Sequence, residues 1–360
     1  MNIPRFLLRP VSWPRLHSPR SRLHSPRSRL RPAGPAALIA LAGLTGLLIA
    51  GCGSSSGSKQ LTLIAYSTPQ SAYAKIIPAF QSTPEGKGWQ FTQSYGASGD
   101  QSRAVLAGLP SDVVALSLAP DVTKLVSAGL VSPSWNQDPY RGFVTDSVVV
   151  FTVRKGNPKH IQSWADLVRP GVQVVTPNPF TSGGARWNVM AAYGAQITQG
   201  KSPTQALLYV KSLFHNVVAQ DKSARDELQT FLAGKGDVAI TYENEAIGAQ
   251  KKGQPVDYVI PPQTIRIENP VAVVTHSKQP TEAQKFVDYL RTPTAQKVFV
   301  GQGYRSILPQ LADPKKFPTP PGLFTIDQLG GWKVVSKKFF DPQKGLIAGI
   351  EQGLGVSTAK

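Results

Sequence analysis

The stretch from Asn178 to Trp187 has the residue types and spacing of an anion-binding loop. An apolar, strand-like run at Val172–Thr176 leads into Pro-Asn-Pro, which neither continues a strand nor starts a helix smoothly. A Ser-Gly-Gly turn follows, and then a helix-compatible run, Ala185–Ile197. N–H groups at a helix start lack intrahelical partners, and the helix dipole adds partial positive charge there. Because Gly183 and Gly184 have no Cβ, a tetrahedral anion could approach the main chain closely, although a Gly-Gly pair can also be only a tight turn.

The elements around this loop alternate between strands and helices. Strands are predicted at Leu61–Tyr66, Gln90–Gln93, Asp112–Leu116, Ser147–Val153, Val217–Ala219 and Val238–Tyr242. Helices are predicted near Ala72–Phe80, Gln101–Leu106, after Ala119 and near Pro203–Phe214. This alternation predicts an α/β fold whose sheets are largely parallel, and such sheets bind ligands beyond the carboxyl ends of their strands. The candidate loops at those ends are Tyr66–Thr68, Ser94–Gly99, Asn178–Ala185, Ser223–Arg225 and Tyr242.

Longer motifs that occur in one order carry a family resemblance. They are Ser94–Gln101, Asp112–Leu116, Arg154–Lys159, Trp164–Leu167, Pro170–Val172, Thr176–Pro179, Ser182–Asn188, Tyr242–Ala246, Phe324–Asp327 and Gly330–Trp332. Over roughly residues 60–345, the chain resembles the sulfate-binding protein family, the substrate-binding components of sulfate and thiosulfate ABC importers. The resemblance implies a two-lobe type II periplasmic-binding-protein fold with a hinged ligand cleft. Lobe I would comprise residues 60–147 and 272–360, and lobe II residues 148–271, with hinge strands at Ser147–Val153 and Val271–Thr275.

The same resemblance implies a set of ligand contacts. They would come from Ser67, Ser98, Gly183, Gly184, Ala224 and Tyr242. Ser98 could offer its amide and its hydroxyl, whereas the glycines and the alanine could offer amides only. Sulfate near neutral pH only accepts hydrogen bonds, so a donor-only site would suit it. Phosphate keeps a proton, which such a site would leave unpaired at a cost of about 1–3 kcal/mol.

Two of these positions depart from the family pattern. Ser67 stands where Asp is common, and Tyr242 stands where a Trp often donates its indole N–H. A serine hydroxyl or a phenol can both donate and accept, which loosens the donor-only rule. Sulfate is the predicted ligand, and thiosulfate, molybdate or phosphate remain alternatives.

Charged residues near the loops have two readings each. Arg186 and Arg225 could bridge the anion directly. In the resembled family uncharged donors hold the anion, so we expect both arginines to position the loops through carbonyls and carboxylates. Glu243 and Glu245 could be paired catalytic carboxylates, but we expect them to begin a helix, where negative charge is favourable.

No motif for catalysis stands out. His160, His215 and His276 have no metal-ligand spacing, and Gly96–Gly99 lacks the G-x-S-x-G pattern. Without a phosphate-binding G-x-x-x-x-G-K-[ST] loop, ATP hydrolysis would belong to a separate subunit of the transporter. We expect no enzymatic activity, no cofactor and no metal. A surface lipoprotein that has lost transport is a further alternative, against which the presence of both anion loops argues.

The N-terminal sequence predicts export. Residues 1–31 carry eight arginines and no acid, and residues 36–50 are apolar or small apart from Thr45. Ile49–Cys52 resembles a lipobox, so residues 1–51 are predicted to be a lipoprotein signal peptide. The apolar run is shorter than the about twenty residues of a membrane span. Because Leu16–Arg22 recurs as residues 23–29, a start codon assigned too far upstream and a disordered basic tail are both open explanations of the long leader.

Cys52 is the single cysteine of the chain, so no intramolecular disulfide can form. We expect it to be lipidated, with residues 52–59 as a Gly/Ser tether that holds the protein extracytoplasmically, on the outer face of the cell membrane. The alternative is an ordinary small residue. The expected partners are the anion, the permease and ATPase subunits of an ABC importer and the membrane, and we expect a monomer.

Size and charge fit this interpretation. Residues 52–360 number 309, enough for two domains with their own cores. Removal of the eight leader arginines would lower the formal net charge from +18 to +10, and such a basic surface could attract anions or sit on anionic lipid or cell wall. No basic cluster has interleaved aromatic residues, so nucleic-acid binding is not expected.

Overall fold

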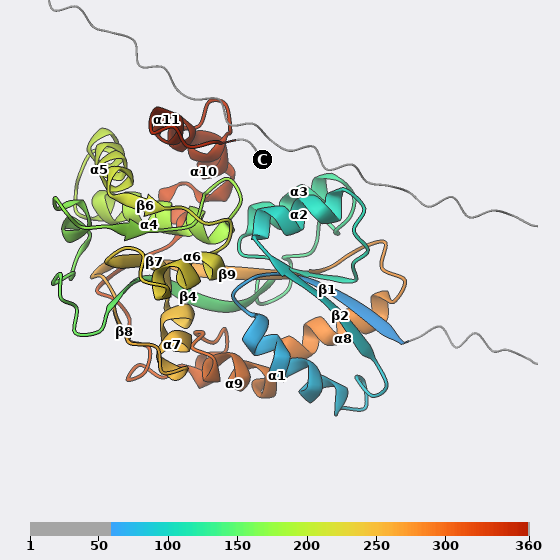
Figure 1. Ribbon diagram of the computed structural model, residues 1–360. Helices are drawn as coiled ribbons and strands as arrows, with labels where there is room; N and C mark the ends of the chain where they lie inside the picture. The colour runs from blue at the N-terminus through green and yellow to red at the C-terminus, as the bar shows by residue number, and fades with distance from the viewer. Residues whose placement is uncertain (1–58, 359–360) are drawn as a thin grey trace, which may run out of the picture. The chain divides into compact units, whose positions relative to one another are not determined.

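The computed structural model describes residues 59–358 (Figure 1). The predicted signal peptide, residues 1–51, and the predicted lipidation site, Cys52, lie outside the described residues. Within the described range, no helix combines the length and the apolar character that crossing a bilayer requires.

A ten-stranded mixed sheet organises the fold. Its main path runs β2-β1-β3-β9-β4-β7-β5-β6, with β10 paired to β9 and β8 paired to β4. The strands are β1 (Gln60–Tyr66), β2 (Gln90–Gly96), β3 (Val113–Ala115), β4 (Phe143–Arg154), β5 (Val174–Val175), β6 (Val217–Ala219), β7 (Val238–Tyr242), β8 (Val256–Val259), β9 (Gln263–Val273) and β10 (Gly322–Phe324).

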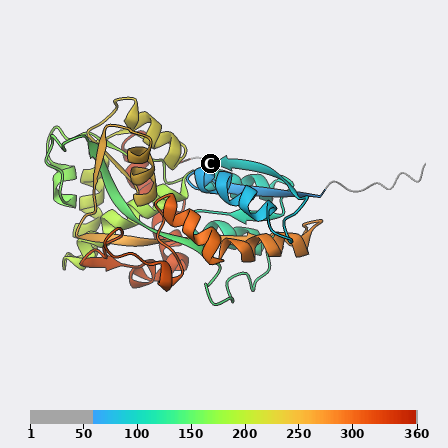
Figure 2. The same cartoon turned by 90° about the horizontal axis from the view of Figure 1, so that it is seen from below.

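The first lobe is built on β1, which pairs in parallel with β2 and β3. Its helices are α1 (Gln70–Gln81), α2 (Ser98–Leu106), α3 (Ala119–Ser127), α8 (Pro280–Leu290) and α9 (Pro293–Gly301). Residues of α1, α8 and α9 share one core cluster with β1, and residues of α2 and α3 share another with β1 and β3. Helices therefore cover both faces of this part of the sheet, as the two views in Figures 1 and 2 show.

The second lobe is built on β5, which pairs in parallel with β6 and β7. Its helices are α4 (Gly183–Thr198), α5 (Pro203–His215), α6 (Ala224–Leu232) and α7 (Glu243–Lys251), and a 3-10 turn, η1, spans Trp164–Val168. Most of α4 is buried, since the helix itself carries apolar or small side chains on nearly every side. The helix that carries the predicted glycine loop is thus held on a core element of this lobe.

Two long strands join the lobes. β4 pairs with β9 over Phe143–Val148 and then with β7 from Val149 onward, whereas β9 pairs with β3 from Val271 onward. Every antiparallel pair of the sheet involves β4 or β9. The prediction of parallel sheets therefore holds within each lobe, and the antiparallel pairs arise because these strands enter from the opposite lobe.

The predicted elements are present, but some helices start earlier than predicted. α4 begins at Gly183 rather than Ala185, and α2 begins at Ser98 rather than Gln101. Propensity disfavours glycine and serine in helices. At α4 the Ser182 hydroxyl accepts a hydrogen bond from the Ala185 N–H, and this cap fixes the helix start. Four of the six predicted ligand residues, Ser98, Gly183, Gly184 and Ala224, therefore lie in first helical turns. The helix α6 itself was not predicted.

The C-terminal segment packs on the second lobe. After η2 (Pro309–Leu311) and β10, it forms η3 (Ile326–Leu329), α10 (Gly331–Phe340) and α11 (Leu346–Gly353). Phe324, Val335 and Phe339 belong to the same core cluster as Val174 and Trp187. The sequence-based division placed this segment in lobe I together with the rest of residues 272–360, whereas its packing favours lobe II from about residue 322 onward.

Candidate functional site

Loops from both lobes meet at one small cavity of about 10 Å³. Its lining consists of Tyr66, Ser67, Thr68, Ala97, Ser98, Ser117, Ser182, Gly184, Ala224 and Tyr242. All of them are buried. Sites for drug-sized organic ligands usually measure about 300–1,000 Å³, so this closed cavity excludes guests of that size.

The cavity collects helix N-termini. Its lining includes the first residues of α2 and α6, Ser98 and Ala224, and the second residue of α4, Gly184. Tyr242, the residue before α7, is also part of the lining. N–H groups in a first helical turn have no partner within their own helix, and the helix dipoles add partial positive charge. No lining residue carries a charged side chain, so the cavity offers an anion neutral donors.

The two glycines allow different close approaches. A Cβ on Gly183 would lie 2.7 Å from the Cβ of Ser117, which belongs to the first lobe. A Cβ on Gly184 would lie 3.2 Å from the Cβ of Ala224, beside the cavity. Gly183 therefore lets the lobes come together, whereas Gly184 keeps space for the guest.

The Ser98 hydroxyl is committed to protein partners. It donates to Oδ2 of Asp121 at 2.7 Å and accepts from the Ser117 N–H at 3.0 Å. Burial opposes ionisation of Asp121, but Lys124, Arg186 and the Ser98 hydroxyl outweigh it and hold the pKa of Asp121 below its usual value. With Asp121 ionised, the Ser98 proton stays on that carboxylate. Ser98 then has its amide, rather than its hydroxyl, left for a guest.

Ser117 and Tyr242 form a hydroxyl pair across the lobes. Their oxygen atoms are 2.7 Å apart, and either can be the donor. The Ser117 carbonyl accepts bonds of 2.9 Å from the Trp187 indole N–H and from the Asn269 amide. Burial raises the pKa of Tyr242 well above its usual value, and the nearby Tyr66 adds to the rise. The phenol therefore remains protonated and can donate.

Tyr66 adds another hydroxyl to the lining. Among the described residues this buried hydroxyl has no hydrogen bond of ordinary geometry, although the hydroxyls of Thr68, Thr145 and Tyr304 lie near enough to act on it. Burial raises the pKa of Tyr66 to about 12, so the group is neutral. A buried hydroxyl without a partner costs free energy, which a guest in the cavity could recover by accepting its proton.

Neither arginine lines the cavity. Arg186 is buried and donates to the carbonyl of Pro179 at 2.8 Å. Arg225 donates to the carbonyl of Thr68 at 2.8 Å and lies 3.3 Å from Glu245. Both guanidinium groups thus hold backbone or carboxylate oxygens of the loops around the cavity.

The nearby carboxyl groups are paired or held neutral. Glu243 forms an ion pair of 2.7 Å with Arg305, and Glu245 pairs with Arg225. Glu227 on α6 is fully buried, and burial followed by the charges of Glu245 and Asp221 raises its pKa well above the usual value. A neutral Glu227 does not repel an anion at the start of α6. Glu243 and Glu245 are thus paired with arginines, Glu227 is neutral, and none of the three lines the cavity.

The structure brings most of the predicted ligand residues to one cavity, and their contact with a ligand stays a prediction. Of the six predicted ligand residues, all but Gly183 line the cavity, and Gly183 is the first residue of α4. Tyr66 and Thr68 belong to a predicted loop but were not singled out. Ser117 was missed, although it follows β3 at the end where ligands bind. In the described residues, 59–358, no group of three or more His, Cys, Asp or Glu residues is placed to hold a metal ion.

Relatives of this chain bind small oxyanions. A sulfate-binding protein of Synechococcus elongatus is 45% identical over 320 aligned positions, which cover 84% of this chain and 91% of that protein. A thiosulfate-binding protein of Pseudomonas aeruginosa is 33% identical over 304 positions, which cover 80% of this chain and 91% of that protein. These relatives are named for binding rather than for catalysis.

The fold also matches a solved structure. The sulfate-binding protein SubI from Mycobacterium tuberculosis H37Rv superposes with a TM-score of 0.77 and 43% identity, covering 79% of this chain and 100% of that one. This match confirms the predicted two-lobe type II periplasmic-binding-protein fold. The profile of bacterial extracellular solute-binding proteins matches residues 61–305. The chain therefore belongs to the bacterial extracellular solute-binding protein family and, within it, to the sulfate-binding proteins.

Proposed function

We propose that this protein captures sulfate between its two lobes and delivers it to an ABC-type importer. The observation that carries the proposal is the small cavity, because helix N-termini and neutral hydroxyl groups from both lobes line it. Sulfate carries no proton near neutral pH, so amides and hydroxyls can satisfy it without a countercharge. The protein would act by binding alone, without catalysis and without a cofactor.

The proposed ligand contacts are the main-chain N–H groups of Ser67, Ser98, Gly183, Gly184 and Ala224, together with the Tyr242 hydroxyl. Arg186 and Arg225 would position the loops rather than touch the anion. Support comes from the lining of the cavity and from the carbonyl contacts of both arginines.

Thiosulfate is the second candidate, because the hydroxyls of Ser117 and Tyr242 can reorient and because a thiosulfate-binding relative is similar over most of its length. Phosphate is less suited. Phosphate would bring a proton that most of the lining cannot accept, at a cost of about 1–3 kcal/mol.

Isothermal titration calorimetry of residues 59–360 against sulfate, thiosulfate, molybdate and phosphate tests the proposal. We expect sulfate to bind about tenfold or more tightly than phosphate, since 1.4 kcal/mol corresponds to a factor of ten. Heat from none of the four anions would reject an oxyanion function. Phosphate binding more tightly than sulfate would reject a site dominated by donors.

The finer assignments are also proposals. Residues 1–51 would be removed on export, and acyl chains on Cys52 would anchor the protein at the outer face of the membrane. There it would act as a monomer that meets the permease of the importer. The lobe boundaries we propose follow the crossing strands, with residues 60–147 and about 272–321 in lobe I.

A further inference from the structure

A second, much larger groove adjoins the anion cavity. It has a volume of about 620 Å³ and is lined by α1 of the first lobe and by α6 and α7 of the second. Thr68 lines both the groove and the cavity. The groove is therefore a place from which a solute could reach the cavity while the lobes are apart.

Positive charge dominates this groove. Lys75, Lys251, Lys252 and Arg225 line it, and Glu245, which pairs with Arg225, is its one carboxylate. None of the three lysines forms an ion pair with a carboxylate in the described part of the chain. Burial lowers the pKa of Lys251, and the charges of Lys316 and Lys75 lower it further. The ammonium groups are thus close enough to repel one another, and an anion among them would relieve that repulsion.

Arg225 stands at the boundary between groove and cavity. Its guanidinium donates to the Thr68 carbonyl across the lobes, and the preceding residue, Ala224, lines the cavity. An anion moving inward from the lysines would pass this guanidinium before it reached the N-termini of the helices. The order of positive groups is therefore lysines outside, one arginine between, and neutral donors inside.

We propose that this groove is an electrostatic vestibule that attracts the doubly charged oxyanion and directs it into the cavity. This inference rests on the proposed function. A cleft lined by one sign of charge focuses the field and raises the association rate constant of an oppositely charged solute by about tenfold or more. The lysines act on the approaching anion and do not touch it once it is bound, so they change the association rate and leave the dissociation rate unaltered.

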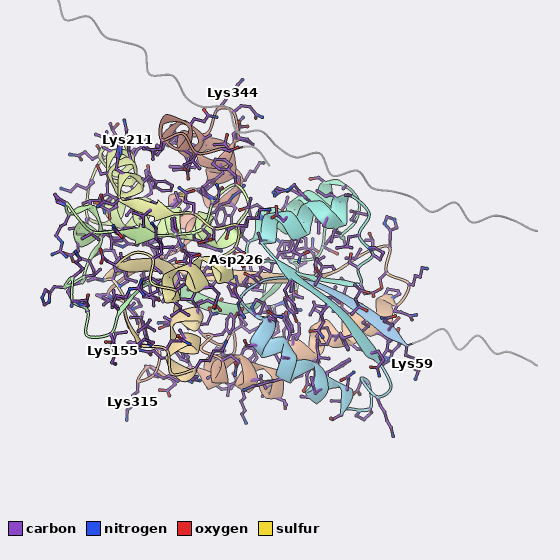
Figure 3. All side chains as sticks on the ribbon, in the orientation of Figure 1. Lys59, Lys155, Lys211, Asp226, Lys315 and Lys344 are labelled. Carbon is purple, nitrogen blue, oxygen red and sulfur yellow. The ribbon has the colours of Figure 1, made fainter. Side chains whose placement is uncertain are left out.

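Stopped-flow measurement of sulfate binding tests the vestibule with two matched double variants. The groove variant is Lys75→Gln with Lys252→Gln, and Lys251 is left intact because its ammonium donates to the Gly301 carbonyl. The control is Lys211→Gln with Lys344→Gln, which removes the same charge from exposed positions. Figure 3 shows these two control lysines at the top of the view, whereas α1 and α7 lie at the bottom in Figure 1.

We expect the groove variant to lower the association rate constant about three- to tenfold at low ionic strength. The effect should vanish near 1 M sodium chloride, where the Debye length is about 3 Å. The dissociation rate constant should not change. The charge-reversed pair, Lys75→Glu with Lys252→Glu, should slow association further, and melting temperatures near that of the unaltered protein would show that the variants fold.

Three outcomes would overturn the vestibule. One is an equal association rate in the groove variant and the unaltered protein. Another is an equal loss in groove and control variants, which would assign the effect to net charge. The third is a change confined to the dissociation rate. If the unaltered protein gives no heat with sulfate, the proposed function fails and the vestibule with it, whereas normal sulfate affinity with unchanged association rates rejects the vestibule alone.

Discussion

The guanidinium of Arg225 in the second lobe donates to the Thr68 carbonyl in the first lobe at 2.8 Å. This bond closes the loops around the cavity, so its loss should favour the open form. We expect Arg225→Ala to weaken sulfate binding about ten- to a hundredfold, because a hydrogen bond from a charged group contributes about 1.5–3 kcal/mol. Calorimetry measures the change.

The matched control for that variant is Arg154→Ala. Arg154 also donates to backbone carbonyls, those of Phe231, Lys235 and Gly236, but all of them belong to the second lobe. The Arg154→Ala change should lower the melting temperature and leave sulfate affinity unchanged. An equal loss of affinity in both variants would contradict a role for Arg225 between the lobes.

Gly183→Ala should obstruct closure of the lobes. The new Cβ would lie 2.7 Å from the Ser117 Cβ, closer than side-chain carbons pack. Overpacking of this kind costs about 1–3 kcal/mol, so we expect sulfate affinity to fall about fivefold or more. The control is Gly349→Ala on α11, where nothing lies within 4 Å of a new Cβ. Unchanged affinity in the Gly183 variant would mean that this contact does not limit binding.

Tyr242→Phe should remove one donor from the site and keep the ring packing. The Ser117 hydroxyl also loses its 2.7 Å partner. One neutral hydrogen bond contributes about 0.5–1.5 kcal/mol, so sulfate should bind about three- to tenfold more weakly in a calorimetric titration. The comparison is Tyr209→Phe, because the Tyr209 hydroxyl donates to the Trp164 carbonyl, away from the cavity. Sulfate binding as tight as that of the unaltered protein would exclude Tyr242 as a contact.

Glu351 should make the protein less stable as pH rises. This residue on α11 is fully buried. One of its carboxyl oxygens accepts from Gln220 at 3.0 Å, while the other has no partner within residues 59–358. Burial raises its pKa to about 7, so the folded protein holds the proton more tightly than the unfolded chain. The protonated Glu351 carboxyl group therefore makes its full contribution to the free energy of unfolding below about pH 4.5, and this contribution is lost as pH rises to about 7.

Glu351→Gln removes this titration. We expect the variant to have a larger free energy of unfolding than the unaltered protein at pH 8, by at most about 3 kcal/mol, and no such advantage at pH 4.5. Urea denaturation at both pH values measures the difference. A difference that stays constant with pH would show that Glu351 does not titrate in this range.

Cys52→Ala tests the anchor, which lies outside the described residues. We expect the variant to appear in the soluble fraction of cells, because two or more acyl chains are needed for stable membrane attachment and Cys52 is the one cysteine that could carry them. Ser54→Ala serves as the control and should stay in the membrane fraction. Membrane retention of the Cys52 variant would reject lipidation at this residue.

Much of the lining of the cavity was predictable because local sequence encodes the loops that form it. Strands followed by Ser- and Gly-rich loops predicted most of the loops that meet at the cavity, and the motifs from Ser94 to Trp332 predicted the family and its fold. Ser117 had no such signal, since a single serine after a short strand is common. Its importance comes from Tyr242, 125 positions away in sequence.

Residue order was sufficient to indicate the fold class and the chemistry of the loops, because strand periodicity, turn residues and helix starts depend on neighbours in the chain. Contacts between distant segments were decided only by folding. They commit the Ser98 hydroxyl to Asp121, place Arg225 between groove and cavity, and pack the C-terminal helices on the second lobe. Such contacts depend on how β4 and β9 bring the lobes together, and pairing between segments that far apart leaves no local pattern in the sequence.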